Sequence, residues 1–153
     1  MTQEDRHFAG AYLPPGLPHP AATSDGLDAP YWEAVRRHAL VVQRCESCQT
    51  YQWEPEWMCH ACQSLAMGWT ETPARGRIYA WTRVWHSVHP SLIEGIPYLV
   101  VVVELPEAGN VRMCGNLLGD PEQEIRSGDV VEAVFEDHPE NDYTLVQWRI
   151  ASN

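Results

Sequence analysis

The stretch CESCQTYQWEPEWMCHAC, residues 45–62, contains four of the five cysteines of the chain. They form two Cys-x-x-Cys pairs with ten residues between them. Two such pairs at the ends of facing hairpins can place four sulfurs around one ion, and zinc prefers four soft, deprotonated ligands in a tetrahedron. The segment between the pairs is long enough to form the short return strand of a ribbon. The spacing therefore predicts a zinc ribbon with the ligands Cys45, Cys48, Cys59 and Cys62.

Other chemistries of these thiols stay open, namely a redox disulfide, an iron–sulfur site and a metal-free cluster. A redox Cys-x-x-Cys normally lies beside a βαβ unit, and no such pattern surrounds either pair. Because four thiolates leave no open position on the ion, the predicted zinc is structural and not catalytic. His60, inside the second pair, is expected to be a bystander. Cys114, in a predicted strand, is expected to be buried as a small apolar side chain.

Upstream of the cysteines the chain changes character twice. Residues 1–27 are rich in proline and lack periodicity, which predicts an extended arm that is either disordered or laid over a partner. Its apolar residues favour a docked arm; they are Phe8, Tyr12, Leu13 and Leu17. A short amphipathic helix is then predicted to about residue 39, with Asp28 as N-cap and Pro30 in the first turn. Residues 40–44 lead directly into the first cysteine pair.

Downstream of the cysteines the apolar period changes from 3.6 to 2, which is typical of strands. Five strand candidates follow: GRIYAWTRVWHS (76–87), YLVVVVEL (98–105), VRMCGNLLG (111–119), DVVEAVFED (129–137) and YTLVQWRIA (143–151). In the first of them, Ile78, Ala80, Thr82 and Val84 are expected to share one face. Five strands without a long helix between them predict a small antiparallel barrel, and a five-stranded Greek-key barrel of OB type fits the count.

The predicted fold class is therefore mainly β: an N-terminal arm and short helix, a rubredoxin-like zinc ribbon, and a five-stranded OB-fold barrel. The predicted division is an arm at 1–27, helix plus ribbon at 28–72, and barrel at 73–153. The net charge of −11 disfavours nucleic acid as a partner, because phosphates require a basic surface. No apolar run has the length of a membrane span and no secretory signal is recognisable, so a cytoplasmic protein is expected.

Catalytic motifs are harder to find. His86 and His89 are expected to be loop histidines, since the strand 76–87 ends there. The nine acidic residues between 120 and 142 are expected to form a solvated face. We therefore predict no catalytic residue. Five of the seven tryptophans crowd the ribbon and first barrel strand. Some should fill the gap between ribbon and barrel, and the others indicate a partner surface.

The order of these parts resembles a known family. A YWEAV helix leads into LVVQRCESC, a second cysteine pair, GRIYAWTRV, PYLVVVVEL, GNLLG and GDVVEAVFED. Over about residues 27–151 this is similar to the bacterial and archaeal zinc-ribbon plus OB-fold proteins associated with acyl-CoA. The arm has no counterpart in the family that we can match.

The resemblance implies an accessory subunit and not a free-standing enzyme. Members of the family bind thiolase-superfamily enzymes, among them thiolases, thiolase-like aldolases that shorten steroid side chains, and the archaeal thiolase–synthase assembly. It implies a hetero-oligomer in which the partner binds most of the acyl-CoA and performs carbon–carbon cleavage or formation; a dimeric partner would give two copies of each chain. The loop 86–98 is expected to contact a ligand or the partner. The competing hypotheses are a single-stranded nucleic-acid module and a small independent enzyme.

Overall fold

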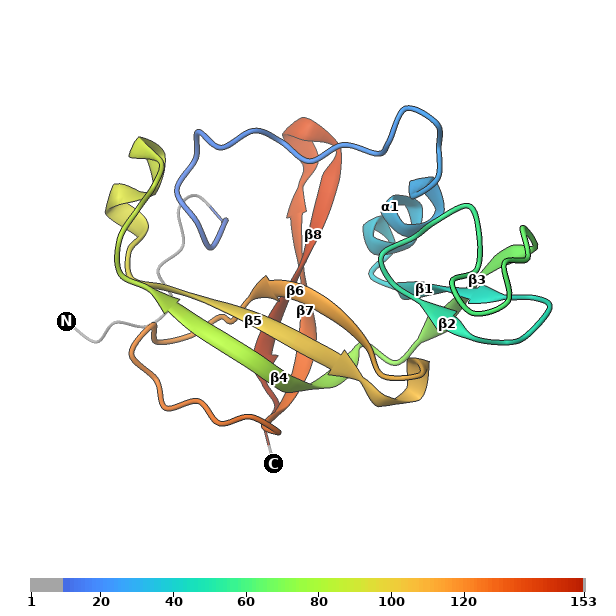
Figure 1. Cartoon of the computed structure of the whole chain (residues 1–153). Helices are drawn as coiled ribbons and strands as arrows, with labels where there is room; N and C mark the ends of the chain where they lie inside the picture. Colours follow the sequence, from blue (N-terminus) through green and yellow to red (C-terminus); the bar gives the residue numbers. More distant parts are fainter. Residues whose placement is uncertain (1–9, 153) are drawn as a thin grey trace.

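The structure is a computed structural model that describes residues 10–152, and within them two antiparallel sheets lie side by side (Figure 1). The smaller sheet has the strand order β2-β1-β3 and the larger β6-β5-β4-β7-β8. The helix and strands are α1 (Ala29–Arg36), β1 (Leu40–Cys45), β2 (Tyr51–Gln52), β3 (Met67–Thr72), β4 (Arg75–Val84), β5 (Tyr98–Leu105), β6 (Val111–Asn116), β7 (Val130–His138) and β8 (Tyr143–Ile150). Three 3-10 helices are η1 (Pro90–Gly95), η2 (Pro106–Ala108) and η3 (Pro139–Asn141). No helix in this described range is long and apolar enough to cross a membrane.

Helix α1 begins where the sequence predicts but ends earlier. Asp28 holds the N-cap position, yet its carboxylate makes no capping bond. It instead accepts hydrogen bonds from Thr23 and from the indole N–H of Trp32. The helix stops at Arg36 and not near residue 39, because His38 adopts the left-handed conformation with φ 58°. This sharp end turns the chain directly into β1.

The ribbon and the barrel share one hydrophobic core. Strand β1 lies between β2 and β3, and its residues Leu40 and Val42 are buried in the same cluster as the barrel interior. Strand β5 buries every second residue; they are Leu99, Val101, Val103 and Leu105. The strand predicted at 98–105 is therefore confirmed, and its burial follows the two-residue period of a strand.

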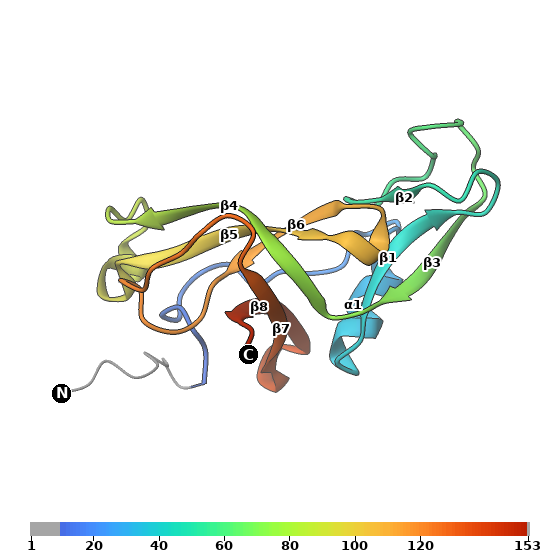
Figure 2. The same ribbon diagram turned by 90° about the horizontal axis from the view of Figure 1, so that it is seen from below.

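The larger sheet curls into a five-stranded, nearly closed antiparallel barrel, the predicted OB-fold (Figure 2). The edge strands β6 and β8 meet at a single parallel bridge between Leu117 and Trp148. Trp148 is fully buried and fills the core next to this seam. Gly115 allows that fit, since a Cβ there would lie 2.7 Å from the Trp148 ring.

A β-bulge in β4 overturns one expectation. The pairing of β4 with β5 shifts between Ile78 and Ala80, so Tyr79 is an extra residue. Because of this one extra residue, every following residue of β4 points to the opposite face of the sheet from the one that strict alternation predicts. Trp81 and Arg83 consequently lie opposite the buried β5 residues Val101 and Leu99. The prediction that Ala80, Thr82 and Val84 share the face of Ile78 is wrong beyond the bulge.

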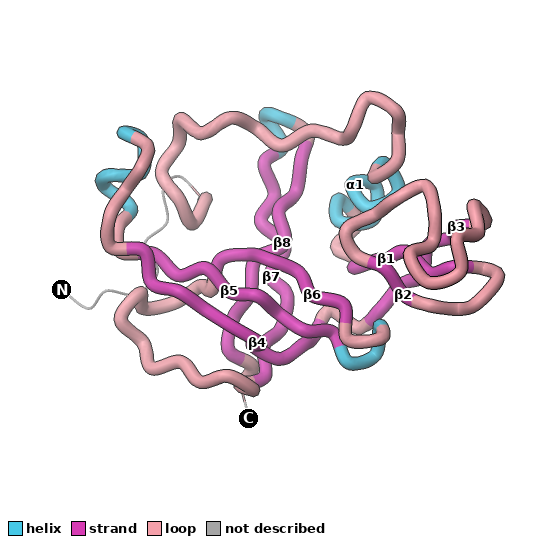
Figure 3. Tube along the Cα trace, in the orientation of Figure 1, coloured by secondary structure: helices cyan, strands magenta, loops and turns pink. Residues whose placement is uncertain are grey.

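The β7–β8 hairpin extends beyond the barrel between two segments from the N-terminal part. On one face, His38 stacks on Phe135 with ring centroids 5.0 Å apart. On the other face, the arm crosses the hairpin, as the blue trace in Figure 1 and the loop in Figure 3 show. The backbone N–H of Tyr12 donates to Glu136, and His19 contacts Tyr143. The arm is thus docked, but on its own barrel; Phe8 lies outside the described residues.

Candidate functional site

The two cysteine pairs sit in two turns of equivalent geometry at the tip of the ribbon. In the first turn, the N–H of Gln49 donates to the carbonyl of Cys45. In the second, the N–H of Gln63 donates to the carbonyl of Cys59. Gln49 and Gln63 both adopt the left-handed conformation, with φ 65° and 62°. In the second turn the backbone N–H of Ala61 also donates to the Cys59 sulfur at 3.4 Å, a contact that suits an anionic ligand.

The four sulfurs form one compact cluster. The ligand atoms of Cys45, Cys48, Cys59 and Cys62 all lie within 4.8 Å of one another. Two of the sulfur–sulfur distances, Cys45 to Cys62 and Cys48 to Cys59, are 3.6 Å. A tetrahedron with Zn–S bonds of roughly 2.3 Å has edges of about 3.8 Å, so the donor set fits zinc. Neither pair opens a helix, which disfavours the redox hypothesis.

Hydrogen bonds favour a thiolate at one of these positions. The side-chain and backbone hydrogen bonds of Thr50 lower the pKa of Cys48 to about 6. The sulfur lies 3.2 Å from the Thr50 hydroxyl. A sulfur that is already ionised near neutral pH is a ready ligand for a divalent cation.

Two buried glutamines, which the sequence did not mark as functional, hold the second turn in place. Gln43 and Gln52 are cross-strand partners in β1 and β2. The Gln52 carbonyl oxygen accepts from the backbone N–H of His60 at 2.9 Å, and its amide donates to the carbonyl of Met58. The Gln43 carbonyl oxygen accepts from the N–H of Glu56 at 2.9 Å. The His60 ring also lies against Gln52, 2.8 Å from its oxygen, and not in the sulfur cluster.

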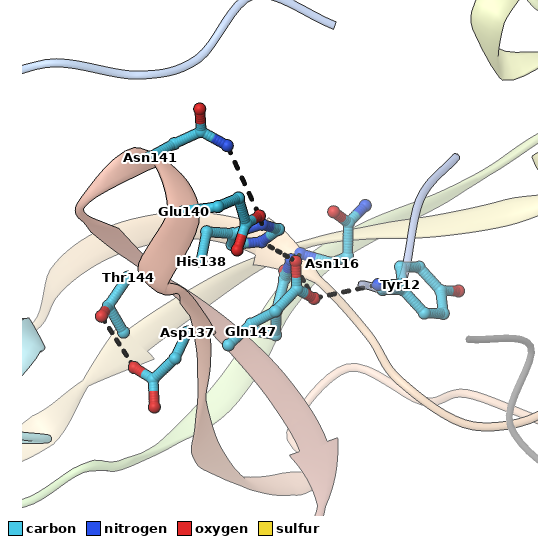
Figure 4. Close-up of polar contacts among 9 residues, drawn as sticks. Tyr12, Asn116, Asp137, His138, Glu140, Asn141, Thr144 and Gln147 are labelled. Atoms are coloured by element: carbon cyan, nitrogen blue, oxygen red, sulfur yellow. Dashed lines mark hydrogen bonds and ion pairs between the residues drawn. The ribbon is translucent and has the colours of Figure 1, made fainter. Parts of the chain in front are cut away.

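A second polar cluster lies where the arm meets the β7–β8 hairpin (Figure 4). The Glu136 side chain is 9% exposed. Its carboxylate takes hydrogen bonds from the Tyr12 N–H and the Gln147 amide, and one oxygen lies 2.7 Å from His138 Nε2. Figure 4 shows His138 and Gln147 on the side of the arm. The expectation that all acids of 120–142 are solvated is therefore wrong for Glu136, which fixes the arm instead.

The other candidate residues are separated from one another. The His89 imidazole accepts from the N–H of Ser91 and caps η1, while His86 is exposed on the same loop. Among the described residues the cysteine cluster is the only group of three or more potential metal ligands. Cys114 is exposed, contrary to expectation, because it follows the buried Met113 in β6 and so points outward.

Large apolar side chains are exposed at both ends of the molecule. In the ribbon segment before the second cysteine pair, Trp57 is 57% exposed. At the loop between β4 and β5, Trp85 is 59% exposed, Val88 92% and Ile93 61%. Arg83 lies over the Trp85 ring and donates to the backbone carbonyls of the 117–129 loop, which fixes this aromatic edge. Trp53, by contrast, packs against the core, as expected for a tryptophan between ribbon and barrel.

Comparisons with known proteins agree with this geometry. Residues 32–68 match the family "ChsH2, rubredoxin-like zinc ribbon domain", and residues 69–136 match "ChsH2, C-terminal OB-fold domain". A solved structure described as the Ltp2-ChsH2(DUF35) aldolase contains a chain that is 30% identical, with a TM-score of 0.75. The match covers 88% of this chain and 100% of that chain. The chain belongs to the ChsH2 (DUF35) family.

Two further comparisons give a more distant structure with the same fold and a relative in sequence. A DUF35-family protein of unknown function from Sulfolobus solfataricus shares the fold, with 9% identity and a TM-score of 0.56 over 85% of this chain and 87% of that one. A protein from Thermomonospora curvata named "Probable enoyl-CoA hydratase alpha subunit" is 34% identical over 111 residues, 72% of this chain. The ChsH2-family chain spans only about a third (33%) of the length of that relative.

Proposed function

We propose that this ChsH2-family chain is a non-catalytic subunit that binds a thiolase-superfamily enzyme and supports carbon–carbon bond cleavage or formation on an acyl-CoA. The observation that carries the proposal is the match, along nearly its whole length, to the ChsH2 chain of an aldolase. The reacting groups would belong to the partner, which would also bind most of the acyl-CoA. A dimeric partner would give an assembly with two copies of each chain.

The proposal includes a structural zinc held by Cys45, Cys48, Cys59 and Cys62. Its support is the sulfur cluster, the matched pair of turns and the likeness to a zinc-ribbon family. With four protein ligands the ion would stabilise the ribbon tip and would leave no position for substrate. The zinc would thus hold Trp57 and its neighbours in place for contact.

The exposed edge of Trp85, Val88 and Ile93 supports a partner surface at the loop 86–98. Contact centres of protein interfaces are enriched in Trp, Tyr and Arg that are held rigidly before binding. The Arg83 contacts provide that rigidity here. A water-exposed apolar edge of this kind favours a protein partner over a stand-alone domain.

The test is to tag the chain, purify it gently from its own host and identify stoichiometric partners by mass spectrometry. A thiolase-superfamily chain is expected, and the purified pair should cleave or form a carbon–carbon bond on an acyl-CoA when the tagged chain alone does not. Turnover by the chain alone would overturn the non-catalytic assignment. Oligonucleotide binding that salt abolishes, with no protein partner, would favour the nucleic-acid module instead.

A second candidate comes from the Thermomonospora curvata relative. Its name favours an enoyl-CoA hydratase assembly, in which a domain like this chain accompanies a hydratase. The same purification separates the two candidates, because the partner would then be a hydratase-type chain. Hydration of an enoyl-CoA by the purified pair would replace the carbon–carbon chemistry.

A further inference from the structure

An aromatic cavity lies between α1, the end of the arm and the ribbon. Its volume is about 290 Å³. Its walls include the rings of Tyr31, Trp32 and Trp53, with Tyr31 and Trp53 only 4.9 Å apart between centroids. Figure 1 shows the arm, α1 and the ribbon loop converging at this place. The cavity is far larger than the roughly 10–15 Å³ that one water needs, so a side chain can enter it.

The charge around the cavity is uniformly negative. Asp28 and Glu54 line it, and none of the lining residues is basic. Burial opposes the ionisation of Asp28, but hydrogen bonds from the Thr23 backbone, the Trp32 indole and the Thr23 hydroxyl hold its pKa below the usual value. Asp28 is therefore a carboxylate at neutral pH. Its charge faces a cavity that contains no counter-ion from this chain.

Two groups at the cavity have no partner in the described chain. The Glu54 carboxylate is exposed and makes no hydrogen bond or ion pair with any residue in 10–152. The Tyr31 hydroxyl likewise makes no hydrogen bond there, although burial raises the pKa of Tyr31 to about 12. Neither group is a buried atom without a partner, so both remain open to accept a hydrogen bond from a ligand that enters the cavity. Aromatic faces next to carboxylates are the usual surroundings of a bound organic cation.

The walls are also fixed in position before any ligand arrives. The Trp57 indole N–H donates to Asp25 at 3.1 Å, which ties the ribbon loop to the arm. The Trp32 indole N–H donates to Asp28 at 2.9 Å, which ties α1 to the same segment. A cavity whose walls are already ordered binds with a smaller loss of conformational entropy.

We propose that this cavity binds a positively charged side chain, arginine or lysine, presented by the partner subunit. Its rings would stack on the guanidinium or ammonium stem, and Glu54 would pair with the charge. The source of the cation rests on the proposed function, whereas the chemistry of the cavity does not. The surface would thus be an acceptor for one basic anchor residue at the α1–ribbon junction.

The first experiment uses the full chain alone. N-acetyl-arginine amide is titrated while the indole signals of Trp32 and Trp53 are followed by NMR, and N-acetyl-citrulline amide serves as the uncharged isostere. Saturable shifts are expected with the arginine probe and not with citrulline. Glu54→Gln should weaken binding by roughly fivefold, the size of a near-surface ion pair. Glu71→Gln, a change at an exposed position of β3, should not weaken it. Equal responses to both probes, or no saturation, would overturn the cation site.

The second experiment uses the complex with its partner. Glu54→Lys should weaken the complex by roughly tenfold through charge repulsion, and Glu71→Lys should leave it unchanged. If the arginine probe binds the isolated chain but Glu54→Lys leaves the complex intact, the assignment to the partner is overturned. If no thiolase-like partner exists, the proposed function fails, while the probe titration still decides the cation site.

Discussion

Gln43 and Gln52 face each other across β1 and β2. Gln43 accepts the backbone N–H of Glu56, just before the second cysteine turn, and Gln52 accepts that of His60, within the turn. Both are almost fully buried. A buried amide that bridges two strands and a loop fixes the loop without using the metal. The ribbon tip therefore has two supports, the sulfur cluster and this pair of glutamines.

Substitution of Gln52→Ala is expected to destabilise the ribbon by about 1–3 kcal/mol, because two hydrogen bonds of the buried Gln52 side chain are lost, one from the N–H of His60 and one to the carbonyl of Met58. The measurement is chemical denaturation, together with the rate at which a chelator removes the metal. Removal should become faster. Glu46→Ala, an exposed change on the first turn, is the control. An unchanged rate in Gln52→Ala would show that the sulfurs alone hold the turn.

Removal of the predicted zinc should affect the ribbon before the barrel. Elemental analysis of natively purified protein is expected to find about one zinc per chain, since four thiolates close the coordination sphere. Cys45→Ser should lower this content sharply, whereas Cys114→Ser should not, because Cys114 lies outside the cluster. Iron in place of zinc would instead support the iron hypothesis.

The close contact of Gly115 with Trp148 predicts that a larger residue at position 115 lowers the stability of the barrel. A Cβ at position 115 would lie 2.7 Å from Trp148 Cδ1 and 2.9 Å from the carbonyl oxygen of Val146. Gly115→Ala should therefore destabilise the protein by about 1–3 kcal/mol through overpacking. Gly68→Ala is the matched control, since the atom nearest to its Cβ would be the flexible end of Glu46 at 3.2 Å, and the backbone oxygen of Arg44 would lie at an ordinary contact distance of 3.6 Å. Thermal unfolding of both variants checks the difference, and equal midpoints would contradict it.

The burial of Tyr31 predicts a loss of stability in alkali. Burial raises the pKa of Tyr31 from 10.0 to about 12. The folded state keeps the proton longer than the unfolded state, so stability is fully present below pH 10 and falls as the pH rises towards 12. The loss is on the order of 2 kcal/mol. Tyr31→Phe should lack this part of the decline when unfolding is measured from pH 9 to 12; a parallel decline in both proteins would refute the assignment.

The sequence predicts those parts of the fold that follow from local pattern. The cysteine spacing predicts the ribbon, and the apolar run of strand length at 98–105 predicts β5, but this run does not show which of its residues are buried. The bulge at Tyr79 is different, because a single extra residue has no signature in the alternation until the partner strand is known. Cys114 was predicted to be buried because of its residue type. It is exposed because the preceding strand residue, Met113, faces the core, so Cys114 faces outward. Glu136 and Gln52 were missed because polar residues become structural only through distant partners, here the arm and the second cysteine turn.

The final prediction concerns the exposed edge at Trp85. Its ring is 59% exposed and rests beside Arg83, so Trp85→Ala removes little from the folded core. The unfolding midpoint should stay nearly unchanged, while affinity for the partner should fall by roughly 30-fold, the effect of losing a contact-centre tryptophan. Tyr79→Ala, also exposed but at the β4 bulge and away from the loop 86–98, is the matched control and should retain binding. Equal loss in both variants would mean a diffuse contact, and no loss in Trp85→Ala would move the partner surface away from the loop 86–98.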